Sequence, residues 1–213
     1  MSSQRDREPL VSLGLYHLFK WTVVAPVSHL GFRLHIHGRE NVPVKGAVVV
    51  VSNHASDFDP PILSHSVGRP VAFMAKEELF RVPILSQAIR LYGAYPVKRG
   101  SGDRQALKSA LSALQNGWAV GIFLQGTRTP DGKITDPKLG AAMISAKFNA
   151  PLLPVCLWGT HHILPKGAKF PKLRPVTVRI GTPIAPPAPD RASLQTVTEL
   201  CAKVINELHD LGR

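Results

Sequence analysis

The chain has 213 residues, of which 44% are hydrophobic, and a formal net charge of +12 from 26 Lys and Arg against 14 Asp and Glu. This length and composition favour one globular domain with a sizeable core. The two cysteines, Cys156 and Cys201, lie far apart in apolar surroundings. They exclude a disulfide framework and indicate buried free thiols in a reducing compartment. No zinc-type spacing is present, so no metal site is expected.

The positive charge is concentrated in one part of the chain. Residues 1–59 are nearly neutral, whereas seven Lys and Arg and no acidic residue lie between Asp136 and Asp190. Such a field attracts an anionic partner, which would be nucleic acid, an anionic membrane surface or an acidic carrier protein. Nucleic acid is disfavoured because the chain has no recognition motif and no aromatic residues interleaved with the basic ones. A solvated basic face without a specific partner is the alternative.

We divide the chain into an N-terminal segment, residues 1–34, and a main domain, residues 35–213. Residues 10–32 carry one formal charge, Lys20, and are long enough to span a bilayer. A span is not expected, because Lys20 lies near the middle, where a charge costs about 2.5–3.5 kcal/mol. The apolar spacing and Trp21 instead favour a membrane-associating helix, broken near Pro26, that lies in one leaflet. A helix packed on the domain core is the alternative.

Beyond this segment, short apolar β-branched runs alternate with helical patterns, which predicts an α/β fold. The sheet should be central, mostly parallel and flanked by helices on both faces. Asp103 and Ser193 are the expected N-caps of two of the helices. The expected strands are 32–37, 47–52, 71–74, 94–97, 119–123, 152–157 and 176–180, and the expected helices are 61–67, 83–91, 103–116, 139–148 and 193–211.

The most informative segment is residues 53–59, NHASDFD, where a strand ends and a helix is about to begin. On a straight helix His54 and Asp59 would be separated by about 140° and would not meet. A turn between strand and helix can bring them together, and an imidazole held by a carboxylate is suited to removing a proton from a hydroxyl. The structural alternative is that Asp59 caps the following helix, with Pro60 at its first position.

Three further segments lie at expected strands. Residues 93–100 (GAYPVKRG) contain the strand 94–97, residues 123–129 (FLQGTRT) begin where the strand 119–123 ends, and residues 150–155 (APLLPV) lead into the strand 152–157. Together with residues 53–59 they resemble the four signatures of the glycerolipid acyltransferases, specifically the 1-acylglycerol-3-phosphate acyltransferase family. The resemblance runs from about residue 38 to about residue 181. Two positions depart from the family pattern. Gln125 replaces a glutamate, and Lys98 stands where an acidic residue often precedes the arginine.

The resemblance implies transfer of a fatty acyl group from a thioester to the free hydroxyl of a lysophosphatidic acid, giving phosphatidic acid in phospholipid biosynthesis. His54 would take the hydroxyl proton and Asp59 would orient its ring, so the enzyme needs no serine or cysteine nucleophile. The two arginines of the later motifs would hold the phosphate, because a guanidinium bonds two phosphate oxygens at once. The residues expected to bind substrate are Lys98, Arg99, Gly100, Gln125, Gly126, Thr127 and Arg128.

No cofactor is expected beyond acyl-CoA or an acyl carrier protein as co-substrate. We expect a membrane-associated protein at the cytoplasmic face, with a lysophospholipid acceptor as its partner. Three alternatives stay open: acylation of a different lysolipid, marked by Gln125; a non-catalytic lipid- or membrane-binding protein of the same fold; and, least favoured, a nucleic-acid-binding protein. Intact His54 and Asp59 argue against a non-catalytic protein.

Overall fold

The computed structural model describes residues 20–81, 94–97, 104–164 and 170–213, together with residues 14, 17, 18, 86, 87 and 89. The helix expected at residues 83–91 lies mostly outside this description, although residues 86, 87 and 89 are helical. The expected cap Asp103 also lies outside it.

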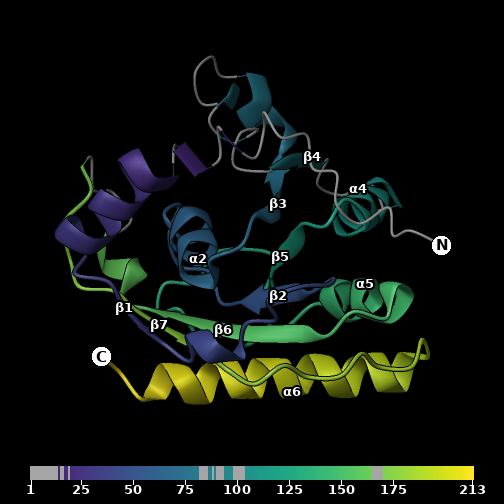
Figure 1. Ribbon diagram of the computed structural model, residues 1–213. Coiled ribbons are helices and arrows are strands. Elements are labelled where there is room, and N and C mark those ends of the chain that lie inside the picture. The colour runs from purple at the N-terminus through teal and green to yellow at the C-terminus, as the bar shows by residue number, and fades with distance from the viewer. Residues whose placement is uncertain are drawn as a thin grey trace.

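One sheet organises the described part of the chain (Figure 1). Its seven strands follow the order β1-β7-β6-β2-β5-β3-β4. Only β6 and β7 pair antiparallel, and the other neighbours are parallel. The predicted α/β fold with a mostly parallel sheet is therefore confirmed. The strands are β1 (His35–His37), β2 (Val49–Ser52), β3 (Val71–Lys76), β4 (Tyr95–Val97), β5 (Ala119–Phe123), β6 (Leu152–Trp158) and β7 (Thr177–Ile180).

Helices cover both faces of this sheet. Figure 1 shows α2 on one side and α5 and α6 on the other. The central strand β2 explains why: Val50 packs in the core cluster that contains α2, whereas Val49 and Val51 pack with the other helices. Alternate side chains of a strand point to opposite faces, so a strand buried on both faces is apolar throughout. The helices are α2 (Asp59–Val67), α4 (Arg104–Gln115), α5 (Gly140–Phe148) and α6 (Arg191–Asp210).

Element boundaries differ from the prediction in three informative places. The first strand begins at His35 rather than at residue 32, because Arg33 has a φ of 43°, which interrupts the extended backbone. The helix α2 begins at Asp59 rather than at residue 61. The cap predicted at Ser193 is wrong: α6 is capped by Asp190, whose Oδ1 accepts a hydrogen bond from the Ser193 amide at 2.9 Å.

The N-terminal segment forms two π-helical stretches, η1 (Lys20–Val24) and η2 (Val27–Gly31). The break expected near Pro26 is wrong, since residues 20–31 are helical throughout and Pro26 has helical angles, φ −59° and ψ −45°. Proline removes one hydrogen bond and its ring clashes with the carbonyl of residue i−4 in an α-helix. The wider π-helical turns on both sides relieve this conflict.

This helical segment has one packed side and one exposed side. Val24 and Ala25 are buried, and η1 contacts α2. Leu18, Trp21 and Leu30 are 60%, 64% and 83% exposed. Among the residues described, no helix combines the length and apolar character needed to cross a membrane. The segment thus packs on the domain, as one alternative proposed, while presenting large apolar side chains outward.

Candidate active site

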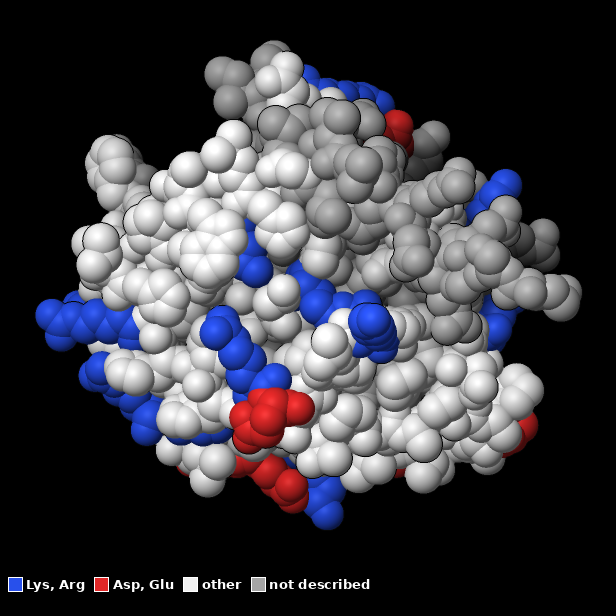
Figure 2. Space-filling view, viewed as in Figure 1, with Lys and Arg blue, Asp and Glu red and all other residues white. Residues whose placement is uncertain are grey.

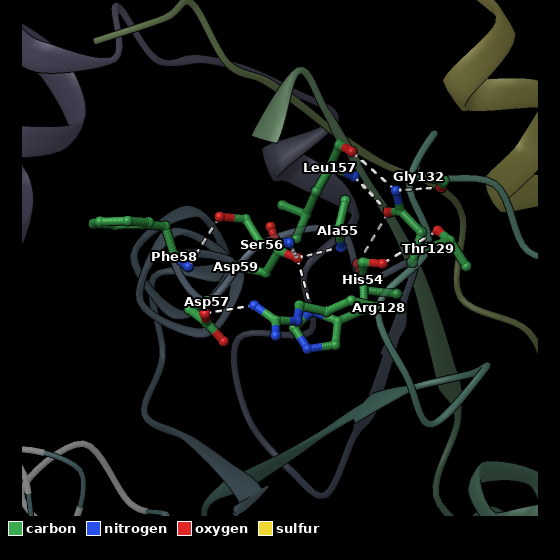
Figure 3. Close-up of polar contacts among 12 residues, drawn as sticks. His54, Ala55, Ser56, Asp57, Phe58, Asp59, Arg128, Thr129, Gly132 and Leu157 are labelled. Carbon is green, nitrogen blue, oxygen red and sulfur yellow. Dashed lines mark hydrogen bonds and ion pairs between the residues drawn. The ribbon is translucent and has the colours of Figure 1, made fainter. Parts of the chain in front are cut away.

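The loop between β2 and α2 brings His54 and Asp59 together (Figure 3). Nδ1 of His54 lies 2.7 Å from Oδ2 of Asp59. The same oxygen accepts hydrogen bonds from the backbone amides of Ala55 at 2.6 Å and Ser56 at 2.7 Å. The Asp59 side chain therefore closes the turn that precedes its own helix, and this turn places the ring beside it. The expected contact between the two residues is present in the structure.

The two side chains differ in exposure. Asp59 is fully buried, whereas 18% of the His54 side chain is accessible. Burying a carboxylate costs several kcal/mol unless donors compensate it, and three nitrogens converge on Oδ2. With Nδ1 directed at the carboxylate, the neutral ring has its lone pair on Nε2, the nitrogen available to a substrate hydroxyl. The pair has the geometry of a general base with its orienting carboxylate.

Phe123, the last residue of β5, fixes the plane of the His54 ring. The two rings are stacked, with centroids 4.0 Å apart and planes inclined by 12°. Strand register explains the contact, because Ser52 pairs with Phe123 in the parallel β2–β5 ladder. His54 follows two residues later and comes to lie over the end of β5. Stacking on one face and hydrogen bonding at Nδ1 together hold the imidazole in one orientation.

Asn53 fastens the same loop to two other parts of the domain. Its Nδ2 donates to the carbonyl oxygens of Gly132, at 2.8 Å, and Leu157, at 2.9 Å. Its Oδ1 accepts from the Leu157 amide at 2.8 Å. The amide of Thr129 donates to the His54 carbonyl at 2.8 Å. The backbone on either side of the imidazole is thus anchored to β6 and to the loop after β5.

Arg128 lies in front of this loop and is paired with Asp57. Its guanidinium Nη1 is 2.5 Å from Oδ2 of Asp57, and the two side chains are 53% and 66% exposed. Figure 3 shows the guanidinium of Arg128 directed at the carboxylate of Asp57. An exposed guanidinium at the loop that carries the proposed base can meet an anionic substrate. In the structure it meets a carboxylate of the same chain.

The other sequence-predicted binding residues are distributed unevenly. Oε1 of Gln125 accepts from the backbone amides of Thr135, at 2.9 Å, and Asp136, at 3.5 Å, so it braces the loop after β5. Gly126 and Thr127 are exposed in this loop, and Gly126 has a φ of 69°. The expected ligands Lys98, Arg99 and Gly100 lie outside the described residues.

The position of β4 bears on those three residues. They follow β4, an edge strand separated from β2 by β5 and β3. Neighbouring strands are about 4.8 Å apart, so the ends of β4 and β2 are separated by about 14 Å along the sheet. A substrate that contacts both strand ends has to bridge this distance.

Both cysteines are buried free thiols, as predicted. Burial raises the pKa of Cys156 and of Cys201 to about 12. Neither thiol therefore forms a nucleophilic thiolate near neutral pH. Within the described parts of the chain, no group of three or more His, Cys, Asp or Glu side chains is arranged to hold a metal ion.

Sequence reasoning assigned no role to Phe123 or to Asn53. An available signal for Asn53 was its position directly after a buried strand, where backbone groups of neighbouring strands need partners. Phe123 gave no such signal, because its contact with His54 depends on the register between two strands 70 residues apart in the sequence.

Comparison with known proteins agrees with the geometry. A family model described as Acyltransferase matches residues 33–158. The chain is 34% identical over 158 residues to a chloroplastic 1-acyl-sn-glycerol-3-phosphate acyltransferase of Arabidopsis thaliana, covering 72% of this chain and 44% of that protein. It is 28% identical over 182 residues to the 1-acyl-sn-glycerol-3-phosphate acyltransferase of Bacillus subtilis, covering 82% and 87%. The chain spans about half the length of several of the curated relatives it matches.

A solved structure is similar over most of the fold. The crystal structure of PlsC, the 1-acyl-sn-glycerophosphate acyltransferase of Thermotoga maritima, superposes with a TM-score of 0.74 at 31% identity. The match covers 93% of this chain and 79% of that one. The family match includes the loop from β2 to α2 and the end of β5, where the histidine and its stacking partner lie. The chain therefore belongs to the acyltransferase family.

Proposed function

We propose that this protein transfers a fatty acyl group from a thioester to the free hydroxyl of a lysophosphatidic acid, giving phosphatidic acid. The observation that carries the proposal is the contact between His54 and Asp59, in which a partly exposed ring is held by a buried carboxylate. The relatives and the solved neighbour bear names of 1-acylglycerol-phosphate acyltransferases. Membership of their family supports the same chemistry here.

In this mechanism the acceptor hydroxyl is the nucleophile. Nε2 of His54 takes its proton as the oxygen attacks the thioester carbonyl, and Asp59 stabilises the imidazolium that forms. The tetrahedral intermediate collapses with cleavage of the C–S bond and formation of the ester. The departing sulfur receives the proton from the imidazolium. A thiolate leaves readily because the pKa of a thiol is about 8.5, and general-base assistance contributes about 10²–10⁴ in rate.

The acceptor phosphate would be bound by cationic side chains around this base. Arg128 is exposed and paired with Asp57 of the loop that carries His54, and a phosphate can replace the carboxylate of Asp57 on its guanidinium. Arg99, with Lys98 and Gly100, would complete the site from the end of β4. Gly126 and Thr127 would bring backbone close to the headgroup. Gln125 would act through the loop it braces.

No resident cofactor is needed, and the acyl donor would be acyl-CoA or an acyl carrier protein. Because the acceptor is a membrane lipid, we propose that the protein works at a membrane, at the cytoplasmic face where such donors are made. The N-terminal segment, residues 1–34, would assist attachment, and residues 35–213 would form the acyltransferase domain.

The test is a transfer assay with purified protein, lysophosphatidic acid and radiolabelled acyl-CoA or acyl carrier protein, in which diacylated product is measured. We expect His54→Ala to lower the rate at least about 100-fold. The matched control is His37→Ala, because His37 is exposed on the edge strand β1. Transfer by His54→Ala within tenfold of the parent rate would contradict the general-base role. Transfer to zwitterionic lysolipids in preference to lysophosphatidic acid would assign a different acceptor.

A further inference from the structure

The segment after the β6 end, residues 170–176, runs alongside the N-terminal helical stretch. The amide of Val176 donates to the carbonyl oxygen of Phe32 at 2.9 Å. Leu173 lies close to Gly31, the last residue of η2: its Cδ2 is 3.1 Å from the position that a Cβ atom on Gly31 would take. Figure 1 shows the same arrangement, with the chain that follows β6 beside the purple helices. Two segments about 140 residues apart in the sequence therefore form one surface.

This surface exposes large apolar side chains from both segments. Phe170 is 81% exposed and Leu173 69%, and Leu30 of η2 is 83% exposed. Isolated exposed leucines are common, but several on adjoining segments indicate a surface that meets an apolar partner. In Figure 2 the region over η1 and η2 is a broad white area with basic side chains along its lower border. We call the following residues the apolar patch: Leu18, Trp21, Val27, Leu30, Phe170 and Leu173.

A basic cavity adjoins the same segment. Its volume is about 400 Å³, and the described residues that line it are Trp158, His162, Lys172, Arg174, Pro175 and Arg213. Three of these side chains are cationic and none is acidic. Lys172 and Arg174 line this cavity, whereas Leu173 between them lies close to Gly31 of η2. One short segment thus contributes two cations to the cavity and an apolar contact to the helical stretch.

We propose that this cavity binds the phosphate of an anionic phospholipid headgroup while the apolar patch contacts the acyl region of the same bilayer. Guanidinium and ammonium groups provide the hydrogen bonds and charge that a phosphodiester requires. The adjoining apolar patch favours a bilayer over a small soluble anion, because such an anion would leave Phe170 and Leu30 in water. Attachment then combines apolar insertion with electrostatic attraction, the combination that stable peripheral binding requires.

The cavity lies near the edge of the sheet that carries the candidate active site. Trp158, which lines the cavity, directly follows Leu157, the partner of Asn53. Since β6 and β2 are parallel, their carboxyl ends lie at the same edge of the sheet. A bilayer bound at the cavity therefore adjoins the edge that carries His54. The attachment itself does not depend on the acyl-transfer chemistry.

The experiment is a vesicle co-sedimentation assay with the full chain carrying His54→Ala, so that the result is independent of activity. We compare vesicles of phosphatidylcholine alone with vesicles containing equal parts of phosphatidylglycerol. The test variant is K172E/R174E, and the charge-matched control is K147E/K203E, whose lysines are exposed on α5 and α6. We expect the test variant to lose at least about tenfold in affinity for anionic vesicles and the control to lose less than about threefold.

A second variant tests the apolar contribution. F170S/L173S leaves every charge in place, so the proposal requires weaker binding to anionic vesicles and greater sensitivity of the remaining binding to salt. If K172E/R174E and K147E/K203E lose affinity for anionic vesicles equally, the proposal is overturned, because binding then depends on the general positive charge of the protein. Full inhibition of vesicle binding by millimolar inorganic phosphate would assign the cavity to a soluble anion. Binding of an acidic carrier protein that is abolished by K172E/R174E, with unchanged vesicle binding, would also overturn it.

Discussion

Phe123 lies flat against His54, with ring centroids 4.0 Å apart, so the orientation of the proposed base is set by a residue of another strand. The strand β5 supplies the side chain that stacks on the face of the ring. The β2–α2 loop supplies the hydrogen bond between Nδ1 and Asp59 at the edge of the ring. A general base has to hold its nitrogen within hydrogen-bond reach of the substrate proton. We infer that Phe123 is a positioning residue for acyl transfer.

Phe123→Leu is accordingly expected to lower kcat about tenfold with little change in KM for the acceptor, because the ring loses its plane while the binding groups stay. Phe123→Tyr keeps the stacking face and should retain most of the rate. The matched control is Phe148→Leu at the end of α5, which removes a ring from the opposite core cluster. If Phe123→Leu and Phe148→Leu lower kcat to a similar extent, the loss reflects a general effect of core packing.

Asp59→Asn tests the carboxylate that holds the base. The substitution keeps the size of the side chain but removes the charge that stabilises the imidazolium, and it presents an amide that favours the wrong ring tautomer. We expect kcat to fall by about 10²–10⁴. Asp57→Asn is the same chemical change two residues away on an exposed side chain and should leave kcat within about threefold. A fall in kcat of less than tenfold in Asp59→Asn would remove the carboxylate from the mechanism.

Asp57→Asn should instead change acceptor binding. In the structure the carboxylate of Asp57 is bonded to the guanidinium of Arg128, which is the group proposed to bind the acceptor phosphate. Exposed ion pairs contribute about 0–1 kcal/mol, so removing the competitor should lower KM for lysophosphatidic acid by up to about fivefold. Arg128→Gln should raise KM, and the effect of Asp57→Asn should vanish in the double variant. An unchanged KM in Asp57→Asn would show that the phosphate does not use Arg128.

Gln125 is one of the two positions at which the sequence departs from the family pattern, and the structure gives it a local role. Its Oε1 accepts two backbone amides of the loop after β5, which a carboxylate can do equally well. Gln125→Glu should therefore keep activity within about threefold and change acceptor affinity modestly. Gln125→Leu leaves both exposed amides to water and should destabilise the protein by about 0.5–1 kcal/mol in urea unfolding. Complete inactivation by Gln125→Glu would show that the site requires a neutral amide.

The fold was predictable because β2, β5 and β6 are apolar and bounded by turn residues, and burial on both faces follows from their composition. The contact between His54 and Asp59 was predictable because only a turn allows that spacing to close. Three contacts could not be predicted: the stacking of Phe123 on His54, the hydrogen bonds of Asn53 to Gly132 and Leu157, and the pairing of Arg128 with Asp57. Each joins segments whose relative position only the folded chain defines. The uninterrupted helix through Pro26 was also missed, because sequence patterns do not distinguish π-helical from α-helical turns.

His65 should make stability depend on pH. It is 2% exposed on α2, with its Nε2 3.1 Å from Nε2 of His29. Burial first, and then the charges of Lys20, His29 and Arg39, lower its pKa from 6.5 to about 4. Between these values the unfolded chain binds a proton that the native protein does not, so the free energy of unfolding decreases as pH falls through this window. Above about pH 6.5 the contribution of neutral His65 to stability is complete.

The measurement is urea unfolding at about pH 7.5 and about pH 5. His161 and His209 also have lowered pKa values because of burial, so the parent protein loses stability for several reasons. His65→Phe keeps a ring beside Trp21 but cannot titrate, and it should reduce the difference in stability between the two pH values by about 1–2 kcal/mol. His37→Gln, at an exposed position, is the control and should leave that difference unchanged. An equal pH dependence in His65→Phe and the parent would mean that His65 is already protonated in the native protein.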